Sequence, residues 1–209
     1  VFFWRFLKPL LLQMRPNRVL EVGSGIGLLS MFASTEVTSV PSIEPESSGF
    51  GTMSAMRSAL VDSWREKNLP DFRSCFIDDL PSGDTFDLIY AINVLEHVSE
   101  PEEVVAQIVQ RLNPGGVAWL VMPNYAFPYE QHFEIPILIN KAITWRVFRR
   151  RIEANDVSTD PQGLWSELSW PTQKKLAKFM RSHSWPHEFR RNVLRASFDR
   201  LEDPEFVNR

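Results

Sequence analysis

Short strand-like runs alternate with helix-like runs from residue 18 to residue 123. Apolar residues cluster or alternate in five short segments, which predict strands over 18–22, 37–44, 72–77, 86–91 and 117–122. Between them, apolar residues at helical spacing predict helices over 27–34, 48–67 and 101–112. Regular alternation of strand and helix is typical of an α/β fold. We therefore expect a Rossmann-like, doubly wound, mostly parallel sheet with helices on both faces.

The pattern changes at both ends of this region. Residues 1–12 have the spacing of an amphipathic helix that packs on the sheet, and they lack the small-residue cleavage site of a signal peptide. After residue 125, an aromatic loop with two prolines precedes predicted helices over 137–152 and 169–182, with a polar loop over 153–163 between them. We expect residues 1–125 to form a ligand-binding core. Residues 126–209 would add a substrate-side loop, a C-terminal helical cap or extension, and a final segment of the same domain.

The amino-acid composition indicates a globular domain but does not indicate a reaction. A chain of 209 residues with 44% hydrophobic and 23% charged residues is ordinary for one globular domain. Its single cysteine, Cys75, gives no internal disulfide, which favours a reducing, cytoplasmic location. No apolar run reaches membrane-spanning length, so we expect no membrane partner.

Charge is distributed unevenly along the chain. Residues 1–130 carry 9 basic and 16 acidic side chains, a net charge of −7, and residues 131–209 carry 14 and 10, a net charge of +4. The basic run Arg149-Arg150-Arg151 could contact an anion, but a solvated helix face is the simpler interpretation. We therefore do not expect nucleic acid as a partner.

A glycine-rich loop follows the first predicted strand. In Glu21-Val22-Gly23-Ser24-Gly25-Ile26-Gly27, three glycines stand at every second position between a strand and a helix. Such a loop lets a nucleotide-like ligand approach the main chain at the helix N-terminus. The spacing GxGxG differs by one residue from the GxGxxG of dinucleotide enzymes, which favours S-adenosylmethionine over NAD.

Acidic residues follow the next predicted strands. Glu44 ends the second strand, where a carboxylate can accept two hydrogen bonds from a ribose diol, and Glu46 is the neighbouring alternative. Asp78 and Asp79 follow the third strand and could accept from an adenine amine, or could simply form the turn before Pro81. Glu21 could bind loop amides or face a cationic ligand, because burying an unpaired carboxylate is costly.

The segment Phe86-Asp87-Leu88-Ile89-Tyr90-Ala91-Ile92-Asn93-Val94-Leu95-Glu96-His97-Val98 completes a recognisable set with the glycine loop and Leu112-Asn113-Pro114-Gly115-Gly116. Over residues 15–125 this set resembles the class I S-adenosylmethionine-dependent methyltransferases, in particular the small-molecule branch that includes ubiquinone-biosynthesis-type O-methyltransferases. That fold usually ends with a sixth strand and an antiparallel seventh, and neither is evident in this sequence.

The resemblance implies a set of cofactor-binding residues. Gly23, Ser24 and Gly25 would line the methionyl part of the cofactor with Glu21 beneath, Glu44 would hold the ribose, and Asp78 and Asp79 would flank the adenine. Ala91 and Ile92 would contact the methionine moiety through their backbone. Gly27, Pro45 and His97 complete the expected set, although His97 could instead be a helix-packing histidine.

The loop after the fifth strand supplies candidates for catalysis. Asn124, Tyr125, Tyr129, Glu130 and His132 fall there, at the sheet edge where ligands bind. His132 is our candidate general base because its ordinary pKa lies near neutrality, and Tyr129 is a second candidate. His132 could instead hold the loop by a hydrogen bond. The histidines, the cysteine and the acidic residues show no metal-ligand spacing, so no metal is expected.

These features predict a methyltransferase that moves a methyl group from S-adenosylmethionine to a small-molecule acceptor, on oxygen, nitrogen or carbon. Two alternatives remain open. An NAD(P)-dependent oxidoreductase would share the glycine loop and Glu44, and a non-catalytic methyltransferase-like subunit would keep the pocket to support a partner. The sequence gives no indication of the oligomeric state.

Overall fold

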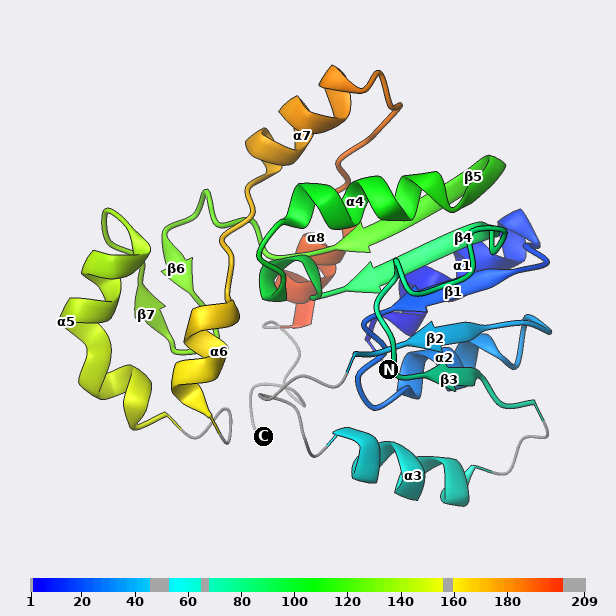
Figure 1. Ribbon diagram of the computed structural model, residues 1–209, viewed down its shortest axis with the longest axis horizontal. Coiled ribbons are helices and arrows are strands. Elements are labelled where there is room, and N and C mark those ends of the chain that lie inside the picture. The colour runs from blue at the N-terminus through cyan, green and yellow to red at the C-terminus, as the bar shows by residue number, and fades with distance from the viewer. Residues whose placement is uncertain (1, 46–52, 65–67, 156–159, 201–209) are drawn as a thin grey trace.

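Five short apolar segments form one parallel sheet in the computed structural model, which describes residues 2–45, 53–64, 68–155 and 160–200 (Figure 1). The strand order is β3-β2-β1-β4-β5, and every neighbouring pair is parallel. The strands are β1 (Val19–Val22), β2 (Pro41–Ile43), β3 (Asp71–Arg73), β4 (Phe86–Ile92) and β5 (Leu112–Val121). In this order the chain first builds outward from β1 to β3 and then returns to the other side of β1 at β4. The carboxyl ends of β1 and β4 therefore form the switch point where ligands bind in such sheets.

Successive side chains of the strands pack into separate cores on the two sheet faces. Val19, Leu88 and Tyr90 point to the face covered by α1 (Trp4–Met14) and α2 (Leu28–Ala33). Leu20 and Ile89 point to the opposite face, which α4 (Pro101–Gln110) covers through Ile108. This arrangement confirms the expected doubly wound α/β architecture and the packing of the N-terminal amphipathic helix on the sheet.

Two strands are shorter than the sequence pattern predicts. The second predicted strand, over 37–44, begins only at Pro41 because the Val37 amide still donates to the Ala33 carbonyl at the end of α2. Proline suits the first residue of a strand, where its missing N–H costs nothing. The third predicted strand, over 72–77, ends at Arg73, and its edge position leaves it only partly buried.

The Asn113-Pro114-Gly115-Gly116 segment lies inside β5 and does not separate the preceding helix from it. The register passes from Phe86↔Leu112 directly to Leu88↔Val117, so these four residues form a bulge in the strand. Gly115 has a φ of 80° there, and the Asn113 amide donates to Asp87 at 2.8 Å. The expectation of a strand over 117–122 was therefore wrong at its start.

The helix predicted over 48–67 appears as α3 (Met53–Ser63), with residues 46–52 and 65–67 outside the described part of the chain. None of its described residues is buried, and Met56 is largely exposed. The apolar positions that predicted this helix therefore do not enter the core. Figure 1 shows α3 outside the β3 edge of the sheet, below α2.

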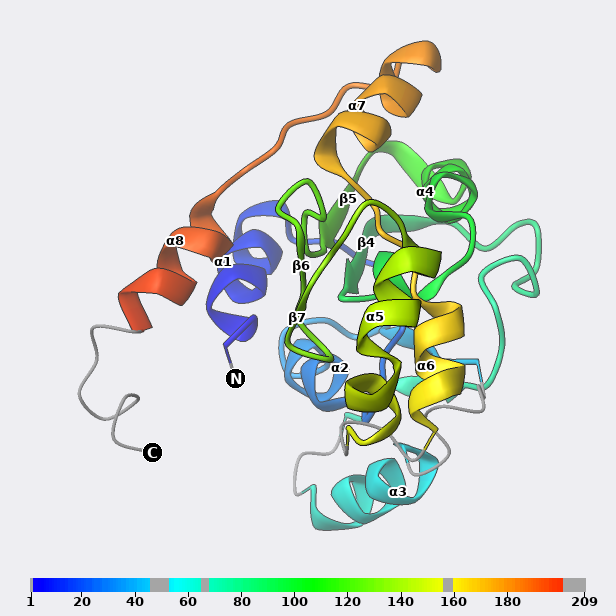
Figure 2. The ribbon, with the colours of Figure 1, turned by 90° about the vertical axis from the view of Figure 1, so that its left-hand side faces the viewer.

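Residues after β5 form a separate layer at one end of the sheet, seen face-on in Figure 2. This layer contains β6 (Tyr129–Glu130), β7 (Ile135–Pro136), α5 (Lys141–Glu153) and α6 (Pro161–Glu167). We call it the cap, residues 125–171. Its own cluster of buried residues, centred on Phe133, Ile152 and Trp165, is joined by Trp145, Phe148 and Trp170. Trp145, Phe148, Trp165 and Trp170 therefore pack in the core of the cap.

Several cap elements differ from expectation. The loop predicted over 153–163 contains the start of α6, which begins at Pro161 after Asp160 accepts a hydrogen bond from the Gly163 amide at 2.9 Å. Proline at the first helical position and aspartate at the cap are standard signals for the start of a helix. The prediction of a loop over 153–163 overlooked both. The helix predicted from 137 begins at Lys141 instead, because the Asn140 side chain caps it by accepting from the Ile143 amide at 2.9 Å.

Two more helices complete the described chain. The helix predicted over 169–182 is α7 (Gln173–Ser182), capped by Thr172, and it lies beside α4 through Leu176. The weakly patterned end contains α8 (Asn192–Asp199), next to the N-terminal segment, with Arg200 over the ring of Phe2 (Figure 2). In the part of the chain that the structure describes, no sixth or seventh strand joins the main sheet. Nor is any described helix both long and apolar enough to cross a membrane.

Candidate functional site

The glycine loop lies at the carboxyl end of β1, at the switch point of the sheet. Val22 pairs with Ile43 on one side and Ala91 on the other, so the ends of β1, β2 and β4 meet there. The amides of Gly23 and Ser24 donate to the Ile43 carbonyl, which fixes the loop to β2 before α2 begins at Leu28. Residues 21–27 are thus held between two neighbouring strands and a helix N-terminus.

Close approach by neighbours explains the glycines at both ends of the loop. Gly23 and Gly27 have φ values of 71° and 80°, and an added Cβ would collide with Val94 at the first and with the Phe72 ring at the second. A Cβ on Gly25 would meet nothing within 4 Å. The Ser24 hydroxyl is buried without a hydrogen-bond partner among the described residues. Gly25 therefore leaves room for a ligand against the main chain, and the Ser24 hydroxyl is a buried group that still lacks a partner.

Glu44 reaches from the end of β2 to the same loop. One of its carboxylate oxygens accepts from the Gly25 amide at 2.6 Å. Burial raises the pKa of Glu44, and the Gly25 amide and Arg57 oppose that shift. Arg57 of α3 donates to the Gly25 carbonyl and stacks over the Phe72 ring, 5.1 Å from its centroid. The sequence analysis did not single out Arg57. Its position in the helix that follows Glu44 and Glu46 was a signal that could have identified it.

Glu21 lies beneath the loop in a buried hydroxyl network. Ser30 and Tyr90 donate to one carboxylate oxygen, the latter at 3.2 Å, and Ser42 extends the network by bonding Ser30 at 2.7 Å. Complete burial raises the pKa of Glu21 well above its usual range. Its partners are therefore side-chain hydroxyls, whereas the sequence had suggested loop amides or a cation.

The remaining residues expected near the nucleoside are spread further apart. Pro45 directly follows Glu44 and is half-buried, and Glu46 lies outside the described residues. Asp78 and Asp79 are exposed and stand several residues beyond the early end of β3. Asp79 accepts from the Phe76 amide at 2.8 Å, which is the turn role weighed for this pair.

The carboxyl end of β4 turns sharply into a short helix. Ala91 and Ile92 are the last residues of β4, and Asn93 follows with a φ of 55° and donates its amide to the Val121 carbonyl. This bend starts the 3-10 helix η2 (Leu95–His97) beside the glycine loop, because Val94 packs against Gly23. The fold thus brings Glu96 and His97 to the loop's side of the sheet.

The cap places His132 against η2. The rings of His97 and His132 lie 4.9 Å apart between centroids, in an edge-on arrangement. Donor atoms of Glu96, His97 and His132 all lie within 4.8 Å of one another. Burial lowers the pKa of His97 to about 4 and raises the pKa of Glu96 to about 7. His97, expected near the cofactor, therefore faces the cap histidine.

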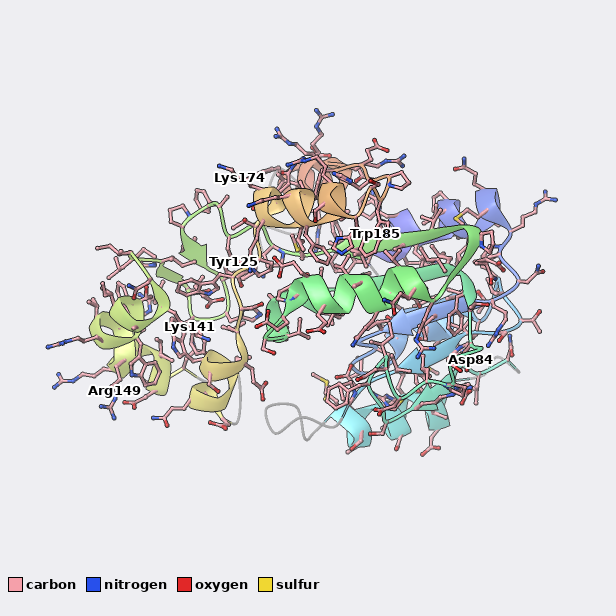
Figure 3. All side chains as sticks on the ribbon, turned by 45° about the horizontal axis from the view of Figure 1, so that its top comes forward. Asp84, Tyr125, Lys141, Arg149, Lys174 and Trp185 are labelled. Carbon is pink, nitrogen blue, oxygen red and sulfur yellow. The ribbon has the colours of Figure 1, made fainter. Side chains whose placement is uncertain are left out.

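A buried carboxylate orients His132. Glu130 Oε1 lies 2.7 Å from His132 Nδ1 and also accepts from the Tyr125 hydroxyl at 3.2 Å, while Oε2 accepts from the Phe133 amide at 2.9 Å. Burial alone would raise the pKa of Glu130, but the bonds from His132 and Phe133 lower it below its usual value. An ionised Glu130 can only accept, so Nδ1 of His132 donates the proton in this contact. Figure 3 shows Tyr125 where the chain passes from the sheet into the cap.

Tyr129, the second catalytic candidate, is not brought to this cluster. It is 42% exposed, whereas the next residue, Glu130, is fully buried. Successive side chains of a strand point to opposite sides, so Tyr129 of β6 faces away from Glu130. The sequence analysis gave Glu96 no role. In the fold, both of its carboxylate oxygens are buried without a hydrogen-bond partner among the described residues.

Known proteins match both the sequence and this architecture. A family profile described as a methyltransferase domain matches residues 3–192. The uncharacterized protein Rv1509 of Mycobacterium tuberculosis (strain ATCC 25618 / H37Rv) is 36% identical over 193 residues, which are 91% of this chain and 65% of that protein. The chain thus spans about two thirds of the length of that relative. The ubiquinone biosynthesis O-methyltransferase of Rhizobium etli (strain CIAT 652) is 29% identical over 109 residues, 51% of this chain and 41% of that enzyme.

Solved structures share the fold at low sequence identity. The YcgJ protein from Bacillus subtilis has a TM-score of 0.56 at 17% identity, over 85% of this chain and 67% of that one. An S-adenosylmethionine-dependent methyltransferase from Clostridium acetobutylicum ATCC 824 has a TM-score of 0.50 at 14% identity, over 61% and 52% of the two chains. With the family match over nearly the whole sequence, they confirm the resemblance found in the glycine loop and the segment after it. The chain belongs to the methyltransferase domain family, with the fold of the class I S-adenosylmethionine-dependent methyltransferases.

Proposed function

We propose that this protein transfers a methyl group from S-adenosylmethionine to a small-molecule acceptor whose proton is taken by His132. The observation that carries the proposal is that the segment from Val94 to His97 contacts both the glycine loop and His132 of the cap. The glycine loop and Glu44 stand on the sheet side, and His132, oriented by Glu130, stands on the cap side. Val94 links them, because it packs on Gly23 and precedes Glu96 by two residues.

The residues at the loop fit the expected cofactor. Gly25 borders open space, Ser24 offers an unpartnered hydroxyl, and Glu44 already stands at the loop as a hydrogen-bond acceptor. Gly23, Ser24 and Gly25 would hold the methionyl part, with Ala91 and Ile92 beside them, and Glu44 would bind the ribose hydroxyls. Asp78 and Pro45 would border the adenine, while Asp79 holds the turn beside them. When bound, S-adenosylmethionine supplies a methyl group on a sulfonium centre, ready for in-line displacement.

His132 would receive the proton of the acceptor at Nε2. Its Nδ1 proton donates to Glu130, which stabilises the positive charge that the ring gains. Tyr125 and the Phe133 amide hold Glu130 in place, so the ring orientation is set before an acceptor arrives. A hydroxyl or a protonated amine would need such a base.

Two experiments separate the cofactor and acceptor halves. Glu44→Gln should weaken S-adenosylmethionine binding about 10- to 100-fold, measured by calorimetry, because one charge-assisted hydrogen-bond acceptor is lost.

His132→Asn should leave S-adenosylmethionine binding unchanged and lower turnover about 10²- to 10⁴-fold in an acceptor screen. His187→Asn, a change at an exposed histidine, is the matched control.

The same titration decides between the alternatives. Binding of NADH or NADPH without S-adenosylmethionine would favour an oxidoreductase, against the family match. Binding of S-adenosylmethionine with no turnover over a broad acceptor set would favour a non-catalytic subunit. Wild-type turnover in His132→Asn would return His132 to a structural role.

A further inference from the structure

We propose that Glu96, His97 and His132 form a binding site for a divalent zinc-type cation between η2 and the cap. The sequence shows no metal-ligand spacing, because two of these residues are neighbours in η2 and the third comes from the β6–β7 turn. Only the fold brings them together, with one donor atom of each within 4.8 Å of the others. The proposal extends the acceptor side of the proposed function.

The donor set has the chemistry of a zinc site. Two imidazoles and one carboxylate, with a further position open, are the protein ligands of many catalytic zinc sites. Ligand atoms about 2.0–2.1 Å from a tetrahedral zinc ion stand about 3.4 Å from one another. The three side chains would therefore have to draw together by about an ångström to close on the ion. Rotation about their side-chain bonds supplies a movement of that size.

Glu96 gives an independent reason to expect a cation. Its side chain is 0% exposed, and neither carboxylate oxygen meets a hydrogen-bond partner among the described residues. A carboxyl group buried in this way is costly unless it is paired or bound to a metal. The Ser169 amide and hydroxyl bond the backbone carbonyls of Glu96 and Leu95, so η2 is fixed while the Glu96 side chain is left for another partner.

Glu130 would complete the outer shell of the site. Metal-binding histidines commonly donate their other ring nitrogen to a carboxylate, which fixes the ring and raises its basicity. Nδ1 of His132 makes this contact with Glu130 at 2.7 Å, and Tyr125 and the Phe133 amide secure Glu130 in turn. Nε2 of His132 is therefore the nitrogen presented to the ion.

The ion and the acceptor proton would compete for one lone pair. Because Nε2 of His132 cannot hold both, a bound cation should inhibit methyl transfer if His132 is the base. Metal binding itself does not depend on activity and can be measured without acceptor or cofactor.

The first test is titration of the metal-free protein with Co²⁺, a spectroscopic substitute for Zn²⁺. A saturable visible absorption band at one equivalent, stronger than that of the aqueous ion and displaced by Zn²⁺, is expected. His132→Asn and Glu96→Gln should each weaken Co²⁺ binding at least tenfold. His187→Asn and Glu134→Gln, which change exposed residues of the same types, should bind Co²⁺ as the wild type does.

If Glu96→Gln fails to fold, His132→Asn alone tests the cation site. His132 is only partly buried, so we expect this variant to fold. The spectrum of the aqueous ion up to millimolar Co²⁺, or equal binding by His132→Asn, would overturn the cation site. An activity assay gives a separate answer. Inhibition of methyl transfer by one equivalent of Zn²⁺ supports both the metal site and the role of His132 as base. If Zn²⁺ binds but activates methyl transfer, the metal site stands and His132 is not the base.

Discussion

At the residue scale, the three loop glycines have different neighbours, and substitutions should separate folding from ligand binding. Gly27 is pressed against the Phe72 ring, whereas Gly25 faces open space. Both have positive φ, so alanine at either position costs about 1–2 kcal/mol of backbone strain. The collision with Phe72 adds to that cost only at Gly27.

Gly27→Ala should therefore lower the free energy of unfolding by about 2–4 kcal/mol. Gly25→Ala should lower it by about 1–2 kcal/mol while weakening S-adenosylmethionine binding at least tenfold, because its methyl group occupies the open space. Urea unfolding and calorimetric titration of the two variants measure both effects. Equal binding by Gly25→Ala and the wild type would place the cofactor elsewhere.

Glu21 should make stability depend on pH in the ligand-free protein. Its pKa is raised in the folded state by complete burial, so folding retains a proton that the unfolded chain releases near its ordinary pKa. The contribution of Glu21 to stability is full below that ordinary value and is lost as pH rises toward the folded pKa. Glu21→Gln should remove this loss while its amide oxygen still accepts from Ser30 and Tyr90.

Urea unfolding at several pH values from 5 to 9 checks this expectation. The wild type should lose stability relative to Glu21→Gln as pH rises. Glu100→Gln, a change at an exposed glutamate, should follow the wild type. A constant difference between Glu21→Gln and the wild type across this range would show that Glu21 does not retain its proton on folding.

At the element scale, α3 is tied to the molecule by one arginine more than by apolar packing. None of its described residues is buried, yet Arg57 bonds the Gly25 carbonyl and stacks on Phe72. Arg57→Ala should raise hydrogen exchange throughout α3 and weaken S-adenosylmethionine binding severalfold, because the loop loses its support. Arg57→Lys keeps the charge but not the forked contact, so it should restore only part of the binding. Exchange in α3 that matches the wild type in Arg57→Ala would show another anchor.

At the scale of the whole molecule, the cap and the sheet have separate cores. Trp165 belongs to the cap cluster with Phe133 and Ile152, while the sheet clusters contain Leu88 and Ile89. Trp165→Ala should destabilise the cap by about 3–5 kcal/mol and loosen His132. We expect S-adenosylmethionine affinity to remain within about threefold of the wild type while turnover falls at least tenfold.

Hydrogen exchange shows where Trp165→Ala acts. Amides of α5 and α6 should lose protection, and those of β1 and β4 should keep it. Leu88→Ala, in the sheet core, is the reciprocal variant and should reduce protection in the sheet and affinity for the cofactor. Equal loss of protection in both regions after Trp165→Ala would show that the two cores unfold as one unit.

The sequence by itself determined the sheet, most of its helices and the position of the glycine loop and Glu44 at the ends of two strands. Alternating strand and helix patterns, a GxGxG loop and a carboxylate after the second strand depend on residues close together in the chain, so local spacing was enough. The same local rules misjudged the end of β3 and the bulge in β5, since the pairing of neighbouring strands sets these boundaries.

Only the tertiary structure brought Glu96, His97 and His132 together. Glu96 and His132 are far apart in the sequence, and no local period links η2 to the cap. Their meeting depends on how β4 bends at Asn93 and on how the cap folds over its own aromatic core. Burial likewise made Glu130 the partner of His132 and left Tyr129 exposed, because a strand one residue out of phase would have exchanged the two.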